Sequence, residues 1–87
     1  ISSMARLCEQ TGDYEESAGY YRKGLESDPL AEELYQGLMA SCIRIGRHAE
    51  ALTTYRRCRD VLKAELGIAP SPRTEALREE ARNSARA

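Results

Sequence analysis

The chain has 87 residues, which is enough for one small domain and too few for a two-domain enzyme. Hydrophobic residues make up 41% and charged residues 31%, with 3 prolines and 6 glycines, a balance typical of a globular, helix-rich chain rather than a disordered or membrane-spanning one. The 13 basic and 14 acidic side chains give a net charge of −1, so no global basic field attracts the chain to DNA or to a membrane surface.

The opening residues and the cysteines indicate the compartment. The chain begins at Ile1 and lacks the apolar core and cleavage site of a signal peptide, which favours a piece of a longer cytoplasmic protein. Its three cysteines, Cys8, Cys42 and Cys58, are odd in number and form no Cys-x-x-Cys pair. We therefore expect reduced thiols, with neither a disulfide framework nor a zinc site.

The first half of the chain predicts two helices joined at a glycine. The first helix covers about residues 1–11 and ends at Gly12, because glycine adopts the positive φ that closes a helix. Asp13 and Glu16 have the spacing of a capping box and predict a second helix over about residues 14–27.

Proline and glycine mark the next two helices. Asp28 and Pro29 predict the start of a third helix, with Asp28 as its N-cap and Pro29 in its first turn, running to about Ile45. A fourth helix over about residues 47–66 follows, and Gly67 supplies its left-handed C-cap.

A fifth and last helix is expected over about residues 72–84, after a segment too rich in proline to be helical. Its few apolar residues are Ala76, Leu77 and Ala81. This pattern is typical of a polar-backed helix that covers the open end of a helical stack.

An internal repeat relates the two halves. When residues 1–34 are aligned with the residues 34 positions later, five of the 34 pairs are identical, where composition alone gives roughly two. These pairs are Cys8 and Cys42, Gly12 and Gly46, Glu16 and Glu50, Tyr21 and Tyr55, and Arg22 and Arg56. We predict one domain with repeat one over residues 1–29, repeat two over 30–67 and a capping helix over 72–84.

This period, with small and aromatic residues at fixed places, resembles the tetratricopeptide repeat. The matching residues are Tyr14, Ser17, Tyr21, Gly24 and Pro29 in repeat one, and Tyr35, Leu38, Ala51, Tyr55 and Cys58 in repeat two. Lys63 departs from the pattern, because a closing proline is expected there. The resemblance implies an all-α, right-handed superhelix of two helical hairpins plus a C-terminal helix.

Three segments carry a more specific resemblance. They are Asp28-Pro29-Leu30 through Glu33-Leu34-Tyr35, then Gly46 through Leu52, then Glu65-Leu66-Gly67-Ile68-Ala69-Pro70-Ser71-Pro72-Arg73-Thr74. Their order resembles the bacterial transcriptional activator domain of antibiotic-regulatory-type activators, over about residues 14–80. Such a domain usually follows a winged-helix DNA-binding domain. The resemblance therefore implies a role in transcription for the parent protein, with DNA bound only through a domain absent from this chain.

The sequence does not favour an enzyme. Its single histidine, His48, occupies the slot that Tyr14 fills in repeat one, which favours a packing role over acid-base chemistry. The cysteines fit the role of small buried hydrophobes, and the chain has no glycine-rich phosphate loop and no metal-ligand spacing. We expect no catalytic residue, no cofactor and no metal.

Partner binding is the function that the architecture supports. Stacked hairpins present the first helix of each repeat on a concave side, where residues away from the packing stripe line a groove. These positions are Arg6, Glu9, Gln10, Glu33, Gln36, Ala40, Ile43 and Arg44. Ile43 is either a contact point or a singly exposed apolar side chain. The Lys, Asn and Arg set with which chaperone-binding members of the repeat class hold a carboxylate is not reproduced, which disfavours that function.

One helix face is locally basic. Arg56, Arg59 and Lys63 share a face of the fourth helix and offer a possible contact to phosphates, although a solvated face is the favoured interpretation.

These observations predict a regulatory protein–protein interaction module of a larger transcriptional regulator. It acts by contact with its own DNA-binding domain, a second copy of itself or another regulator. The alternative is a generic tetratricopeptide adaptor that binds a peptide in its concave groove and is unrelated to transcription.

Overall fold

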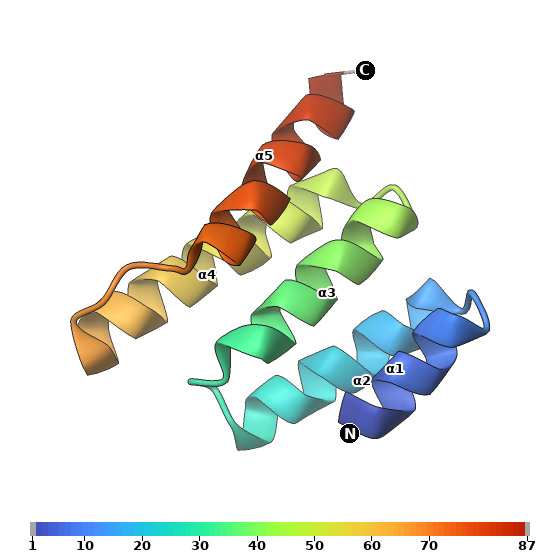
Figure 1. Ribbon diagram of the computed structural model, residues 1–87, viewed down its shortest axis with the longest axis horizontal. Helices are drawn as coiled ribbons and strands as arrows, with labels where there is room; N and C mark the ends of the chain where they lie inside the picture. The colour runs from blue at the N-terminus through green and yellow to red at the C-terminus, as the bar shows by residue number, and fades with distance from the viewer. Residues whose placement is uncertain (1, 87) are drawn as a thin grey trace.

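The structure, a computed structural model, describes residues 2–86, with side chains described for residues 4–85. This range contains no strand and five helices, which are α1 (Ser2–Gln10), α2 (Tyr14–Ser27), α3 (Glu32–Arg44), α4 (His48–Leu66) and α5 (Pro72–Arg86). Helices α1 and α2 form one hairpin, α3 and α4 form a second, and α5 packs on both α3 and α4 (Figure 1). The fold is therefore all-α and tetratricopeptide-like, as the sequence predicts.

The same turn closes both hairpins. Gly12 and Gly46 have φ angles of +83° and +81°, a left-handed conformation that glycine adopts without steric cost. In each turn the residue after the glycine donates its N–H to a carbonyl oxygen five residues back, over 2.8 Å. The two pairs are Asp13 with Cys8 and Arg47 with Cys42. These are Schellman closures, and the positive φ that they require accounts for the glycine identity at a spacing of 34.

The predicted start of the third helix at Pro29 is wrong. Residues 28–31 form a turn, in which the Ala31 N–H donates to the Asp28 carbonyl oxygen over 3.3 Å. Helix α3 begins only at Glu32. Aspartate followed by proline is as typical of the first two positions of a β-turn as of a helix N-terminus, so the local sequence was ambiguous. A hydrogen bond from the Tyr35 hydroxyl to the Pro29 carbonyl oxygen, 2.7 Å long, holds the turn in place.

The other predicted helix ends agree closely with the structure. Asp13 accepts a hydrogen bond from the Glu16 N–H over 3.1 Å and caps α2, and Gly67 closes α4 with a φ of +65°. The reciprocal half of the capping box is absent from the described residues, because the Asp13 N–H already closes the preceding turn. The predicted last helix, 72–84, extends to Arg86.

One hydrophobic core runs through the helices and is centred on α3. Tyr35, Met39 and Cys42 of α3 are fully buried, and α5 contributes Leu77 and Ala81. Burying two residues of the last helix makes that helix part of the core and not a peripheral addition.

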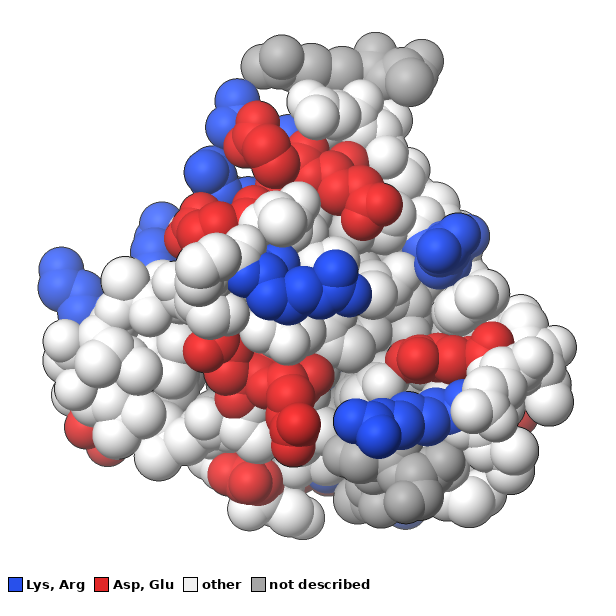
Figure 2. Space-filling model, in the orientation of Figure 1, with Lys and Arg blue, Asp and Glu red and all other residues white. Residues whose placement is uncertain are grey.

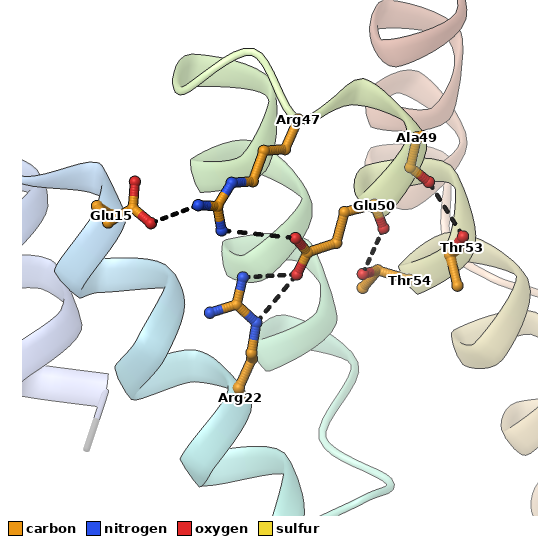
Figure 3. A network of polar contacts seen from close by, with 7 residues as sticks. All are labelled: Glu15, Arg22, Arg47, Ala49, Glu50, Thr53 and Thr54. Carbon is orange, nitrogen blue, oxygen red and sulfur yellow. Dashed lines mark hydrogen bonds and ion pairs between the residues drawn. The ribbon is translucent and has the colours of Figure 1, made fainter.

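A network of charged side chains connects the two hairpins. Arg22 of α2 donates to the Glu50 carboxylate of α4 over 2.6 Å, and Arg47 lies 2.7 Å from Glu15 and 3.8 Å from Glu50 (Figure 3). The side chains of these ion pairs are 34–63% exposed. Because solvent screens exposed charges, each pair stabilises the fold only modestly. The network nevertheless fixes where α4 lies relative to α2.

Candidate functional site

A hollow of about 270 Å³ opens between α1, α3 and α5. Its walls are Arg6, Glu9, Tyr21, Glu33, Gln36, Gly37, Ala40 and Arg73. Figure 2 shows this face, on which basic and acidic side chains lie interleaved. The structure thus brings together five residues of the predicted groove, namely Arg6, Glu9, Glu33, Gln36 and Ala40.

The other three predicted groove residues lie outside this hollow. Gln10 is exposed at the end of α1, and Arg44 is exposed at the end of α3 with its guanidinium 5.8 Å from the centroid of the Tyr14 ring. Ile43 is half-buried and packs against the core, so it is not a free contact point.

Hydrogen bonds fix the inner wall of the hollow. The Tyr21 hydroxyl donates to the Glu9 carboxylate over 2.5 Å, and the Ser17 hydroxyl lies 3.4 Å from the same carboxylate. Burial and this bond to Glu9 raise the pKa of Tyr21, so the phenol stays protonated. The Tyr21 ring lies directly against Gly37, where a Cβ atom would overlap it.

Gln36 is held by the start of α5. Its amide donates to the Ser71 and Thr74 hydroxyls over 3.2 and 3.0 Å. The Glu32 carboxylate accepts from the Ser71 N–H over 2.8 Å and from the Thr74 hydroxyl over 2.5 Å. Burial alone would raise the pKa of Glu32, but the hydrogen bonds from Thr74 and Ser71 outweigh it and lower the pKa. These contacts position α5 and, with it, Arg73 at the rim of the hollow.

Three charged groups of the hollow are available to a partner. Within residues 4–85, Arg6, Glu33 and Arg73 make no ion pair and no side-chain hydrogen bond, and all three are exposed. The rim therefore offers two cations and one anion without breaking an existing contact.

Sequence reasoning missed Tyr21, Gly37 and Arg73 as residues of the hollow. Arg73 belongs to the segment that resembles the activator domain, but its place beside α3 depends on how α5 crosses that helix. For Gly37, the available signal was its place in the middle of a predicted helix. Glycine destabilises a helix interior, so its presence there indicates close packing against a neighbour.

The predicted basic face lies along a second surface. Arg56, Arg59 and Lys63 are exposed on α4, and they border two hollows between α4 and the segment that contains α5. Arg78 and Arg82 of α5, which the sequence reasoning did not include, join them there.

The residues considered for catalysis, the three cysteines and His48, are buried or half-buried. All three cysteines are buried and free, and burial raises the pKa of Cys42 to about 11 and that of Cys58 to about 12. Such thiols are protonated at neutral pH and are poor nucleophiles. His48 is half-buried at the start of α4, and its buried Nδ1 has no hydrogen-bond partner among the described residues.

The described part of the chain has neither a cluster of metal-binding side chains nor a helix that could cross a membrane. No group of three or more His, Cys, Asp or Glu side chains in this part has the arrangement to hold a metal ion. None of the five helices combines the length and the apolar character that crossing a bilayer requires.

Comparison with known proteins gives one family and two kinds of relative. The family described as bacterial transcriptional activator domain matches residues 1–82. The chain is 43% identical over 51 residues to the regulatory protein AfsR of Streptomyces griseus, and equally so to that of Streptomyces coelicolor. It is 32% identical over 63 residues to the Hsp70-Hsp90 organising protein of Plasmodium falciparum. No solved structure matches.

The matched regions are small parts of these relatives. They cover 59% of this chain but 5% of each AfsR protein, and 72% of this chain but 25% of the organising protein. The similarity therefore concerns a module and not a whole protein.

Proposed function

The chain belongs to the bacterial transcriptional activator domain family, and from this we propose that it is the protein-contact module of a larger, cytoplasmic transcriptional regulator. Two of the relatives are named regulatory proteins, and the matched region is 5% of their length. A module of this size has room for a contact surface, while DNA is bound by another part of the regulator.

The hollow between α1, α3 and α5 is the observation that carries this proposal. Its rim holds three exposed charges that no described side chain neutralises, and its inner wall is fixed by hydrogen bonds. A preformed wall reduces the entropy lost on binding, and unpaired charges select a partner with the opposite pattern. We expect the partner to present a protein surface with at least one carboxylate for Arg6 or Arg73.

Contact then regulates by shifting an equilibrium. The partner is the regulator's own DNA-binding domain, a second copy of the regulator or another regulatory protein. The regulator exists in conformations in which the rim is either accessible or covered. Binding in the hollow stabilises the accessible conformation by the difference in the partner's binding free energy between the two.

The test reverses the charge of the rim in the intact regulator. The double variant Arg6→Glu and Arg73→Glu should reduce transcription from a reporter promoter about tenfold, because two favourable charge contacts become repulsive. The matched control, Lys23→Glu with Arg57→Glu, reverses the charge of two exposed side chains that do not line this hollow, and should leave the reporter unchanged. Full reporter output from the double variant would refute the proposed site.

A second candidate function is that of a peptide-binding adaptor outside transcription. The similarity to a protein named for organising Hsp70 and Hsp90 supports it. The same double variant separates the two functions when partner capture and reporter output are both measured. Loss of capture with unchanged reporter output would establish the adaptor and reject the regulatory module.

A further inference from the structure

A second groove runs along α4 on the side of α5. It consists of two neighbouring hollows, of about 380 and 220 Å³, which share Tyr55 and Arg59 in their walls. It has no lining residue in common with the hollow between α1, α3 and α5. Any ligand of this groove is thus separate from the partner proposed above.

The rim of this groove is basic. Arg56, Arg59 and Lys63 project from α4, and Arg78 and Arg82 project from α5. In Figure 2 basic side chains follow one another along the upper left edge, over α4 and α5.

Acidic neighbours neutralise only part of this charge. Arg78 and Arg82 pair with glutamates of their own helix, and Arg59 lies 3.1 Å from the adjacent Asp60. Among the described residues, Arg56 and Lys63 have no carboxylate within ion-pair distance. The groove therefore keeps a net positive charge at its rim.

The floor of the groove is apolar. It is formed by the half-buried Leu52, the Tyr55 ring and the segment Ile68–Ala69–Pro70. Ile68 is 48% exposed, and the neighbouring Leu66 is 53% exposed. Apolar surface of this kind gains free energy when apolar side chains cover it.

The floor is also preformed. The Tyr55 hydroxyl donates to the Glu75 carboxylate over 2.6 Å, and the Arg78 guanidinium lies 5.3 Å from the centroid of the Tyr55 ring. Both contacts come from α5 and hold the ring in place, so a ligand does not need to order it.

We propose that the α4–α5 groove docks an acidic amphipathic helix of a partner protein. The apolar side of that helix covers Leu52, Tyr55 and Ile68, and its carboxylates face the arginines and the lysine of the rim. A helix in a groove between two helices is a common mode of peptide recognition. DNA fits less well, because its phosphates match the rim but leave the apolar floor uncovered.

The experiment measures binding of a synthetic peptide to the 87-residue chain by fluorescence anisotropy. The probe is a peptide that forms an amphipathic helix of about four turns. Its leucines follow one another at alternating spacings of three and four residues along one face, and glutamates flank that face. We expect micromolar binding that weakens about tenfold when the glutamates are replaced by glutamines, and again when the salt concentration rises.

A pair of charge-matched variants locates the binding site. Arg56→Gln with Arg59→Gln should weaken binding about tenfold, because both side chains border the groove. Lys23→Gln with Arg57→Gln removes the same charge from exposed positions outside the groove and should bind as the unchanged chain does.

Three results of the peptide measurements would overturn the proposal, and a fourth comes from competition with DNA. They are absence of peptide binding, equal affinity for the glutamate and glutamine peptides, and equal weakening in the two variants. Stronger competition from random-sequence duplex DNA than from unlabelled peptide would also overturn it, and would identify the groove as a nucleic-acid surface. Because Arg6 and Arg73 are untouched, failure here leaves the proposed function unaffected.

Discussion

Gly37 has no room for a side chain. A Cβ atom at this position would lie well under 3.0 Å from three ring atoms of Tyr21, a residue that is only 6% exposed. Replacement by alanine would push the ring aside and disturb its hydrogen bond to Glu9. The sequence offered only a glycine inside a helix, and the crossing of α2 and α3 supplies the reason for it.

We predict that Gly37→Ala lowers the free energy of unfolding by about 2 kcal/mol, as overpacking of a core does. The matched control is Gly19→Ala, because a Cβ at Gly19 would meet nothing within 4 Å. There the higher helix propensity of alanine should stabilise the chain by up to about 1 kcal/mol. Chemical denaturation of both variants checks the prediction, and a stabilised Gly37→Ala protein would contradict it.

At the scale of the elements, one carboxylate joins α3 to the start of α5. Glu32 at the first turn of α3 accepts two hydrogen bonds from the start of α5, from the Ser71 N–H and the Thr74 hydroxyl. A negative charge at a helix N-terminus also interacts favourably with the helix dipole. The attachment therefore depends on the ionised form of this side chain.

We predict that Glu32→Gln lowers the free energy of unfolding at neutral pH by about 1–2 kcal/mol, because hydrogen bonds to a charged group stabilise but Glu32 is only half-buried and partly screened by solvent. Because its pKa is lowered in the folded chain, Glu32 stabilises above its unfolded pKa of about 4.3. That contribution is lost as the pH falls through the lower, folded value. Denaturation of both chains at pH 7 and at low pH measures this effect. The difference in free energy of unfolding between the variant and the unchanged chain should shrink as the pH falls.

The control for this prediction is the next residue. Glu33 is exposed and forms no hydrogen bond or ion pair within residues 4–85, so Glu33→Gln should change stability by less than about 0.5 kcal/mol. Equal effects of the two substitutions would show that net charge, and not the contact with α5, determines the result.

Local signals determined how well the elements were predicted. The turns at Gly12 and Gly46 are closed by backbone hydrogen bonds that each span only six residues. Because these signals are local, the sequence alone located both hairpins. Asp28 and Pro29 suit a turn as well as a helix start, and the choice is made by the Tyr35 hydroxyl bond, which no local pattern reveals. The candidate site was found in part for the same reason, since its α1 and α3 residues follow from helix periodicity. The arginines of α5 were missed because contacts between residues 39 and 42 positions apart place that helix.

For the whole molecule, the core contains ionisable groups that are neutral when folded. Burial raises the pKa of Cys42 to about 11 and of Cys58 to about 12, and it also raises the pKa of the core tyrosines, Tyr21, Tyr35 and Tyr55. In the unfolded chain these groups ionise at lower pH, near 8.5 for cysteine and 10 for tyrosine. Ionisation therefore favours the unfolded chain.

We predict that the stabilisation from keeping these groups neutral is complete below about pH 8.5. The free energy of unfolding then falls steadily as the pH rises toward the folded pKa values of the thiols. Replacing Cys8, Cys42 and Cys58 by alanine removes the thiol contribution, so the decline should begin only near pH 10, where tyrosines ionise. Urea denaturation between pH 7 and 11 measures both curves. A stability independent of pH over this range, or an unchanged onset in the triple variant, would contradict the prediction.

Among the described residues, each helix packs mainly on the helix that precedes or follows it in the chain, and α5 also packs on α3. Proteins built from such local contacts have a low contact order and fold within milliseconds or less. During synthesis α1 and α2 can pair once residue 27 has left the ribosome, but the packing of α2 on α3 must wait until α3 has emerged. Residues of α5 line both the groove beside α4 and the hollow between α1, α3 and α5, so both surfaces are complete only after α5 has emerged and docked.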